Sequence, residues 1–185
     1  LHIEYRLLQG LNISTNLGYG RNTTSEHSEY PAAAQNPSYS YITASFANNV
    51  FQTINIEPQI NYKKAIGKGV FSALLGVSYK KNTNNSNSTT GAGYANDYFL
   101  GSIIGATTIY ASDNSNIYKY DAGFARLNYI YNQKYIVNLT GRRDGSSNFG
   151  PGKQFGNFGS IGAGWIFSEE KGFRNILPFF SYGKL

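Results

Sequence analysis

Residues that could act in catalysis or bind a metal are few in this chain, and they do not form a group. The two histidines, His2 and His27, are far apart, and neither has a partner at metal-ligand spacing. Glu169 and Glu170 are adjacent, so on a strand their carboxylates would point to opposite faces rather than act as paired acid and base. Residues 156–164 are glycine-rich, but no amphipathic helix follows to form a phosphate site. The sequence therefore predicts a protein that is not an enzyme, with no metal site and no cofactor.

The strongest local motif is Arg142-Arg143-Asp144-Gly145. Asp144-Gly145 is a turn signal that would close a strand. Because neighbouring strand residues alternate between faces, Arg142 should lie on the polar face and Arg143 on the opposite one. The Asp144 carboxylate can accept a charge-assisted hydrogen bond from a nearby guanidinium. We interpret the motif as a structural loop anchor in preference to a substrate site.

The composition excludes several classes of protein. The net charge is +6, but the cations are scattered, so nucleic-acid binding is not expected. The absence of cysteine excludes disulfides and thiolate metal sites. No run of roughly 18 apolar residues could form a membrane helix, whereas a membrane strand needs only about 9–11 residues that are apolar at alternate positions. Aromatic residues, at 16%, are unusually abundant for so polar a chain.

Alternation of apolar and polar residues is the main structural signal, and it predicts an all-β, antiparallel up-and-down sheet of barrel type. The alternation recurs over residues 11–19, 51–62, 70–80, 126–131, 135–142 and 160–168. The apolar face should be the convex, lipid-facing side and should include Ile54, Ile56, Ile60, Leu75, Val77, Leu139 and Trp165. The polar face should line a concave lumen and should include Asn55, Glu57, Gln59, Asn138 and Thr140.

Short and long connections alternate along the chain. Tight hairpins are expected at Gln9, Ile66 and Gln133, and long links are expected over residues 21–50, 81–117 and 145–156. Outer-membrane barrels have short periplasmic turns and long extracellular loops, so the three long links should lie at one end. Tyr129, Tyr131 and Tyr135 flank one short turn, where they would form an aromatic belt at the membrane interface.

The second half of the chain also resembles a known family, the SusC-like TonB-dependent transporters. The resemblance covers residues 118–185 and is carried by Arg126-Leu127-Asn128-Tyr129, Lys134-Tyr135, the block from Arg142 to Pro151, the strand from Phe158 to Trp165, Ser168-Glu169-Glu170 and Ser181-Tyr182-Gly183. Gly159 stands where the family usually has proline, and Ile166 where a polar residue is frequent. The resemblance implies a TonB-dependent active importer of glycans or peptides in the Gram-negative outer membrane. It also implies a partner TonB protein and a SusD-like surface lipoprotein.

The same resemblance sets the expected domain organisation. We expect residues 1–185 to form part of one barrel domain, contributing about eight strands of a roughly 22-stranded barrel. The chain has no initiator methionine, and both ends, Leu1–Leu8 and Pro178–Leu185, are strand-like, so the plug domain and the remaining strands should lie outside it. Two alternatives are a small eight-stranded barrel that acts as an adhesin or anchor, and a soluble β-sandwich binding module.

Tyrosine and asparagine residues in the long links are the candidate ligand contacts. A tyrosine offers a flat stacking face and a hydroxyl at low entropic cost, and carboxamides add hydrogen bonds to sugars or peptides. The alternative is that exposed loops merely tolerate these residues. The candidates are Tyr39, Tyr41, Tyr94, Asn96, Asp97 and Tyr98, with Asn48 and Asn49 in support. The structural motif comprises Arg142, Arg143, Asp144, Gly145 and Trp165.

Overall fold

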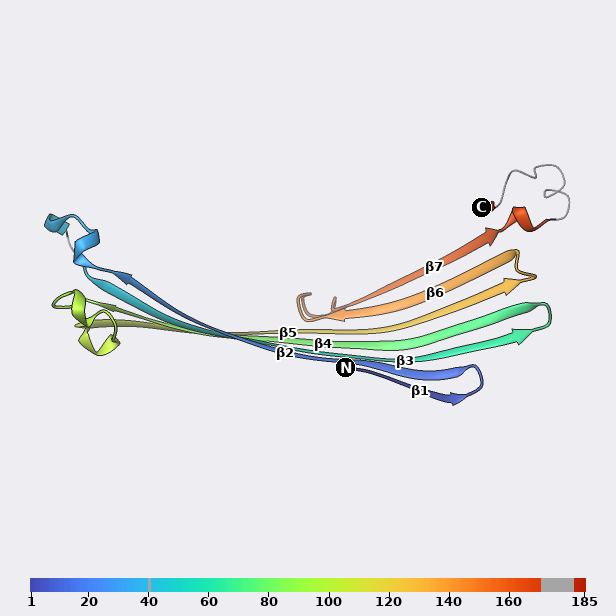
Figure 1. Ribbon diagram of the computed structural model, residues 1–185, viewed down its shortest axis with the longest axis horizontal. Helices are drawn as coiled ribbons and strands as arrows, with labels where there is room; N and C mark the ends of the chain where they lie inside the picture. The colour runs from blue at the N-terminus through green and yellow to red at the C-terminus, as the bar shows by residue number, and fades with distance from the viewer. Residues whose placement is uncertain (40, 171–181) are drawn as a thin grey trace. The chain divides into compact units, whose positions relative to one another are not determined.

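The computed structural model describes residues 1–39, 41–170 and 182–185, and its strands form one sheet. Each strand pairs with the next along the chain, as Figure 1 shows, so the up-and-down topology is confirmed. The strands are β1 (His2–Leu8), β2 (Leu11–Tyr30), β3 (Thr43–Ile66), β4 (Gly69–Ala92), β5 (Thr108–Tyr131), β6 (Tyr135–Ser146) and β7 (Phe155–Trp165). A single sheet cannot form a sandwich, so that alternative is wrong.

The described part of the chain has seven strands where about eight were predicted. The first half of the expected last strand, Pro178–Leu185, lies outside the described residues, and this half includes Ser181. At its end, Leu185 and Trp165 exchange two backbone hydrogen bonds of 2.9 Å each. Among the described residues, no helix is long and apolar enough to cross a membrane.

Contacts divide the sheet into two units, which we describe separately. The first, called the wall unit, comprises Leu1–Gly18, Ile54–Lys80 and Lys119–Leu185. The second, called the loop unit, comprises Tyr19–Thr53 and Lys81–Tyr118. The wall unit holds the tight turns, and the loop unit holds the two longer connections. Each site described below lies within a single unit.

The tight turns of the wall unit follow from residues that tolerate positive φ. Gly10 (φ +83°), Gly67 (φ +58°) and Asn132 (φ 51°) adopt the left-handed conformations that match short hairpins to strand twist. The turns lie along one edge, because the Lys63 amide donates to the Gly10 carbonyl (2.7 Å) and the Asn132 amide to the Lys68 carbonyl (2.9 Å). Hairpins at Gln9 and Gln133 are confirmed, whereas the turn expected at Ile66 falls at Gly67-Lys68, because glycine is the residue that enters the left-handed region.

The predicted long links are mostly strand, which corrects the sequence analysis. β2 continues to Tyr30 and β3 begins at Thr43, so the connection between them is residues 31–42, not 21–50. Likewise β4 runs to Ala92, so the second connection is 93–107, and the third is 147–154. Short polar side chains join neighbouring strands of the loop unit, as in Thr53 Oγ1 donating to Asn82 Oδ1 (2.9 Å). Cross-strand pairs of this kind stabilise a sheet without any apolar alternation, so the pattern did not reveal these strands.

The apolar face of the wall unit lies on the surface rather than in a core. Ile56 is 38% exposed, Val77 51% and Leu139 48%. The remaining predicted members, Ile54, Ile60, Leu75 and Trp165, are exposed as well. In the described residues the largest fully buried side chain is Leu100, which belongs to the loop unit. A soluble protein rarely leaves so much contiguous apolar surface in water, so this face fits contact with lipid.

Candidate functional site

Two adjoining hollows lie on the polar face of the wall unit. The first has a volume of about 670 Å³ and is lined by Arg6, Asn12, Lys63, Ser72, Arg126, Asn128 and Asn138 among others. The second, of about 560 Å³, is lined by Gln59, Phe124, Thr140, Arg142, Phe158 and Ser160 among others. Leu74 and Arg126 border both. Both hollows therefore lie on the polar face, and their linings include Gln59, Asn138 and Thr140, which the alternation assigned to that face.

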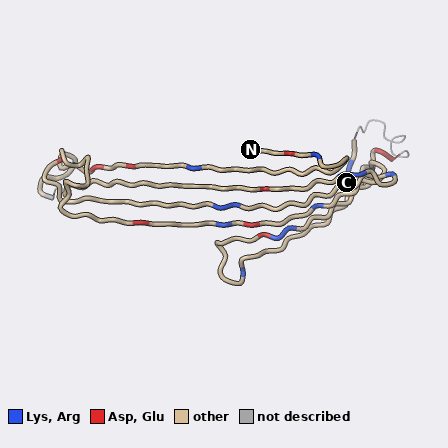
Figure 2. Tube along the Cα trace, turned by 90° about the horizontal axis from the view of Figure 1, so that it is seen from below, with Lys and Arg blue, Asp and Glu red and all other residues tan. Residues whose placement is uncertain are grey.

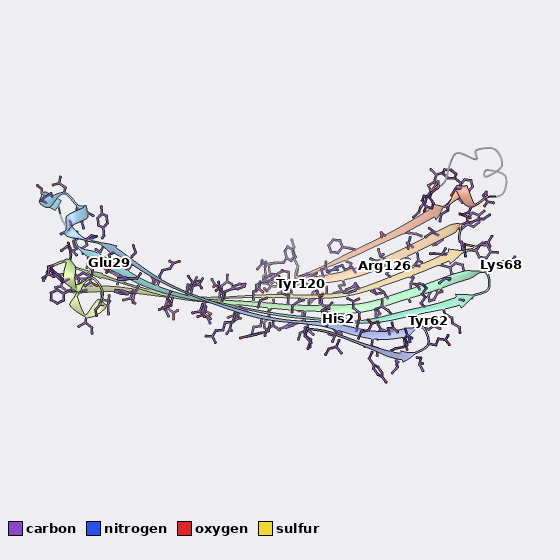
Figure 3. All side chains as sticks on the ribbon, in the orientation of Figure 1. His2, Glu29, Tyr62, Lys68, Tyr120 and Arg126 are labelled. Atoms are coloured by element: carbon purple, nitrogen blue, oxygen red, sulfur yellow. The ribbon has the colours of Figure 1, made fainter. Side chains whose placement is uncertain are left out.

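The first hollow is cationic. Arg6, Lys63 and Arg126 line it, and no aspartate or glutamate does. Charged residues are sparse along the strands (Figure 2), so three cations in one hollow are a local concentration. Arg126 extends from β5 (Figure 3), near Asn128, whose Nδ2 donates to Asn138 Oδ1 at 2.6 Å. Guanidinium and carboxamide groups together suit carboxylate or peptide ligands.

Arg142 occupies the second hollow in a cluster of polar and aromatic groups. Its Nε donates to Asp144 Oδ1 at 2.6 Å, and its Nη2 donates to the Tyr120 hydroxyl. Its guanidinium also lies 5.6 Å from the Phe124 ring centroid. The predicted pairing of Asp144 with a guanidinium is confirmed. The sequence motif did not single out Tyr120 and Phe124, although their even spacing from Arg126 on one strand places all three on one face.

Arg143 lies on the opposite face, also as predicted. Its guanidinium lies 5.0 Å from the Phe155 ring centroid. A Cβ added at Gly145 would meet that ring, so glycine makes room for Phe155 there. The expectation that Asp144-Gly145 closes the strand was wrong. Both residues stay in register with β7, and β6 ends at Ser146.

Aromatic side chains gather where β5 and β6 meet their tight turn. The rings of Tyr129 and Tyr131 have centroids 6.4 Å apart, as do those of Tyr131 and Tyr135. Trp165 lies directly across from Tyr135 in the sheet register, and its ring packs edge-on against Phe167 at 6.0 Å. This arrangement matches the aromatic belt predicted beside the turn.

A pH-dependent clamp holds the end of this belt. Glu170 accepts hydrogen bonds from Lys134 Nζ (2.9 Å) and the Tyr135 hydroxyl (2.8 Å), and the first of these contributes most to lowering the pKa of Glu170 below its ordinary value. A lowered pKa means that the contribution to stability is complete above the ordinary carboxyl pKa and is lost as pH falls through the folded value.

The thermal midpoint of the full-length barrel should therefore fall more steeply in wild type than in Glu170→Gln between pH 5 and 3, roughly one unit either side of a carboxyl pKa. Parallel curves would contradict the clamp.

The candidate ligand residues of the loop unit differ in exposure. Tyr98 is 96% exposed and Tyr41 56%, so both rings are available to a partner. Tyr94 is 5% exposed and packs with Ala44 and Leu100, which gives it a role in supporting the loop. Its burial raises the pKa of the hydroxyl, which has no hydrogen-bond partner in the described part of the chain. Tyr39 ends the 3-10 turn Pro37–Tyr39, and its side chain lies outside the described residues.

The polar candidates of the loop unit hold backbone in place. Asn96 caps the 3-10 turn Asp97–Phe99 through the Tyr98 amide (3.0 Å), and Asp97 Oδ1 accepts from the Ala32 amide (2.7 Å). Asn48 accepts from Ser25 Oγ (2.7 Å), while Asn49 is exposed. A further residue that the sequence analysis missed is His27, which stacks on Phe46 at 4.4 Å and bonds the Leu100 carbonyl at 3.2 Å. Of these contacts, the hydrogen bond from the Ala32 amide to Asp97 joins the two connections directly.

Sequence comparison relates the chain to TonB-dependent receptors. It is 27% identical over 184 residues to TonB-dependent receptor P39 of Formosa agariphila, covering 95% of this chain and 18% of that protein. It is 34% identical over 141 residues to receptor P26 of the same organism, covering 70% of this chain and 14% of that protein. It is also 35% identical over 69 residues to TonB-dependent receptor SusC of Bacteroides thetaiotaomicron, covering 37% of this chain and 6% of that protein. No protein-family model matches the chain.

Structural comparison agrees on the fold. The structure of the RagAB peptide transporter superposes with a TM-score of 0.83 at 19% identity, covering 91% of this chain and 19% of the other. The chain thus spans less than a fifth of the length of the curated relatives it matches. The relatives are named as receptors and the superposed structure as a transporter, and none is named as an enzyme. The chain therefore belongs to the SusC-like TonB-dependent receptors, as a segment of their outer-membrane β-barrel.

Proposed function

We propose that the chain is a wall segment of an active importer. The observation that carries this proposal is the contrast between the two faces of the wall unit. One face exposes aliphatic and aromatic side chains, which suits lipid. The other is hollowed, polar and cationic, which suits a lumen that guides a ligand or holds a plug. A wall with these two faces separates lipid from an import path.

The remaining parts of the proposed importer lie outside this chain. We propose that residues 1–185 belong to one barrel domain, to which other segments add a plug and the remaining strands. TonB would supply the energy, and a SusD-like surface lipoprotein would capture the ligand. The ligand would be a glycan or a peptide. The names of the relatives support the TonB requirement, and the superposed transporter is a peptide transporter.

Uptake by cells tests the importer proposal directly. Cells with the full-length gene should accumulate fluorescent oligosaccharides or peptides from a panel, and cells with the gene deleted should not. A protonophore should abolish the difference, because TonB-dependent import draws on the proton gradient across the inner membrane. A panel that both strains take up equally would argue against import of these ligand classes.

Within the loop unit, we propose that Tyr41 and Tyr98 contact the ligand or the lipoprotein. Asn96 and Asp97 would position Tyr98, since they hold the 3-10 turn that carries it. Tyr94 would act through the packing of the loop, and Tyr39 is retained as a candidate at the end of its turn. The support is exposure together with a fixed backbone, because a rigid aromatic anchor loses little entropy on binding.

Tyr98→Ala should weaken the association of ligand or lipoprotein about tenfold, a typical loss for an aromatic anchor. The barrel itself should assemble normally, because the ring is 96% exposed and supports no packing. Pull-down of the lipoprotein and uptake of the ligand by the full-length transporter measure the effect. Tyr94→Phe is the matched control, since it removes only a buried, unpartnered hydroxyl and should leave both readouts unchanged. Unchanged binding by Tyr98→Ala would remove this ring from the proposed contact.

A further inference from the structure

The apolar face of the wall unit carries a groove that the import function does not use. Its volume is about 440 Å³, and its lining includes Ile56, Pro58, Val77, Tyr79, Phe155 and Arg143. Five of these six side chains are apolar or aromatic, and the sixth is a cation. The groove lies on the face opposite the cationic hollows, because its residues alternate with those of the lumen side.

A missing side chain creates the groove. Gly123 on β5 pairs with Arg143 in the sheet register, and a Cβ added there would meet nothing within 4 Å. The space above this glycine is therefore open. It is bordered by the side chains of Tyr79 and Phe155. An acyl chain could lie in such a slot, because burying each methylene against apolar surface is worth about 0.8 kcal/mol.

The cation at the groove is available to a ligand. The Arg143 guanidinium packs over the Phe155 ring, and no ion pair joins it to a carboxylate among the residues that the structure describes. Asp121 also borders the groove, and Lys119 lies two positions away on the same face of β5. A planar guanidinium with free N–H groups is suited to bidentate binding of a phosphate.

The position of Arg143 along its strand matches a membrane interface. From Tyr135 in the aromatic belt, the outer-face residues of β6 are Val137, Leu139 and Gly141, and Arg143 is the first charge. The path from Tyr135 to Arg143 is about 27 Å at roughly 3.4 Å per residue. At a strand tilt of about 40°, this path rises about 20 Å, close to the apolar band of about 25 Å in outer-membrane barrels. Arg143 therefore lies at headgroup level, at the end of the band opposite the tyrosines.

We propose that this groove binds a phosphate-bearing membrane lipid, with an acyl chain over Gly123 and the phosphate on Arg143. The required lipid chemistry is a phosphate and at least one acyl chain on the same molecule. Lipid A and glycerophospholipids both carry it, and the experiment separates them. The site rests on the membrane location of the barrel and is independent of what the barrel imports.

Native mass spectrometry of the full-length transporter in detergent tests the proposal. Lipid A, phosphatidylglycerol and diacylglycerol are added separately, and the fraction of barrel that retains each is measured. Wild type should retain at least one phosphate lipid and should not retain diacylglycerol, and the preferred phosphate lipid identifies the source. Arg143→Gln should lower retention about tenfold, the usual effect of losing a charge-assisted hydrogen bond, and Arg143→Lys should restore part of it.

Two glycine variants test the slot itself. Gly123→Leu should fill the groove and lower retention of the same lipid, and its Cβ has open space. Gly141→Leu is the matched control. It lies on the same face of β6, is equally open and does not line the groove, so retention should match wild type. Arg126→Gln removes one positive charge from the lumen side, so it tests whether net charge alone changes lipid retention. Equal retention by Arg143→Gln and wild type, or equal loss in Gly123→Leu and Gly141→Leu, would overturn the proposal.

Discussion

Leu75→Arg should destabilise the full-length barrel by about 2–4 kcal/mol in lipid, which is the cost of a charge on the lipid face near the bilayer midplane. Leu75 lies on the apolar face of β4 and is 59% exposed, so more than half of its surface is free of protein that could shield the guanidinium. The fraction of folded barrel in vesicles, followed by gel mobility across a denaturant series, gives the change in free energy of unfolding.

The neighbouring leucine provides the matched control. Leu74 borders both cationic hollows on the opposite face, so an arginine there would extend into water. Leu74→Arg should cost less than about 1 kcal/mol, chiefly from repulsion by Arg126, which solvent screens. Both variants lose a leucine and gain an arginine, so the difference between their losses of stability reports contact with lipid. Equal destabilisation by the two variants would mean that Leu75 does not face lipid.

The wall unit could be predicted from the sequence because its two faces meet different solvents. Ile54, Ile56 and Ile60 alternate with Asn55, Glu57 and Gln59, and alternation of this kind fixes both the strand and the face of each residue. The opposite placement of Arg142 and Arg143 followed from the same rule. Once the faces were fixed, the short turns between successive strands were enough to indicate which strands pair.

The loop unit could not be predicted in the same way. Its strands continue through residues such as Asn82 to Thr90, where both faces are polar and no period appears. Pairs such as Ser45 with Thr90 and Ser115 with Asn85 hold these strands together, and the residues that meet depend on register rather than on composition. The burial of Tyr94 was hidden for a similar reason, since its neighbour Ala44 is distant in sequence. Tyrosines that appear equivalent in a loop therefore divide into buried support and exposed contact.

Gly10 is the turn residue whose replacement should cost most. Its φ of +83° disfavours any side chain, and a Cβ there would collide with the Lys63 carbonyl oxygen of the neighbouring hairpin. Backbone cannot move aside as a flexible side chain can, and the hydrogen bond from the Lys63 amide to the Gly10 carbonyl, 2.7 Å long, would be disturbed as well. Adding a left-handed penalty of about 1–2 kcal/mol to the loss of about 1 kcal/mol for the bond gives about 2–3 kcal/mol for Gly10→Ala, and the collision adds to this cost.

Gly67→Ala separates the collision from the conformational penalty. Gly67 also has a positive φ, of +58°, but an added Cβ would meet nothing within 4 Å. Its replacement should therefore cost only about 1–2 kcal/mol, the left-handed penalty alone. Denaturant midpoints of the two full-length variants in vesicles provide the comparison. A larger loss at Gly10 would show that the first hairpin is held in register by contact with the second, because Lys63 belongs to β3. Equal losses would show that turn conformation alone determines the stability of both hairpins.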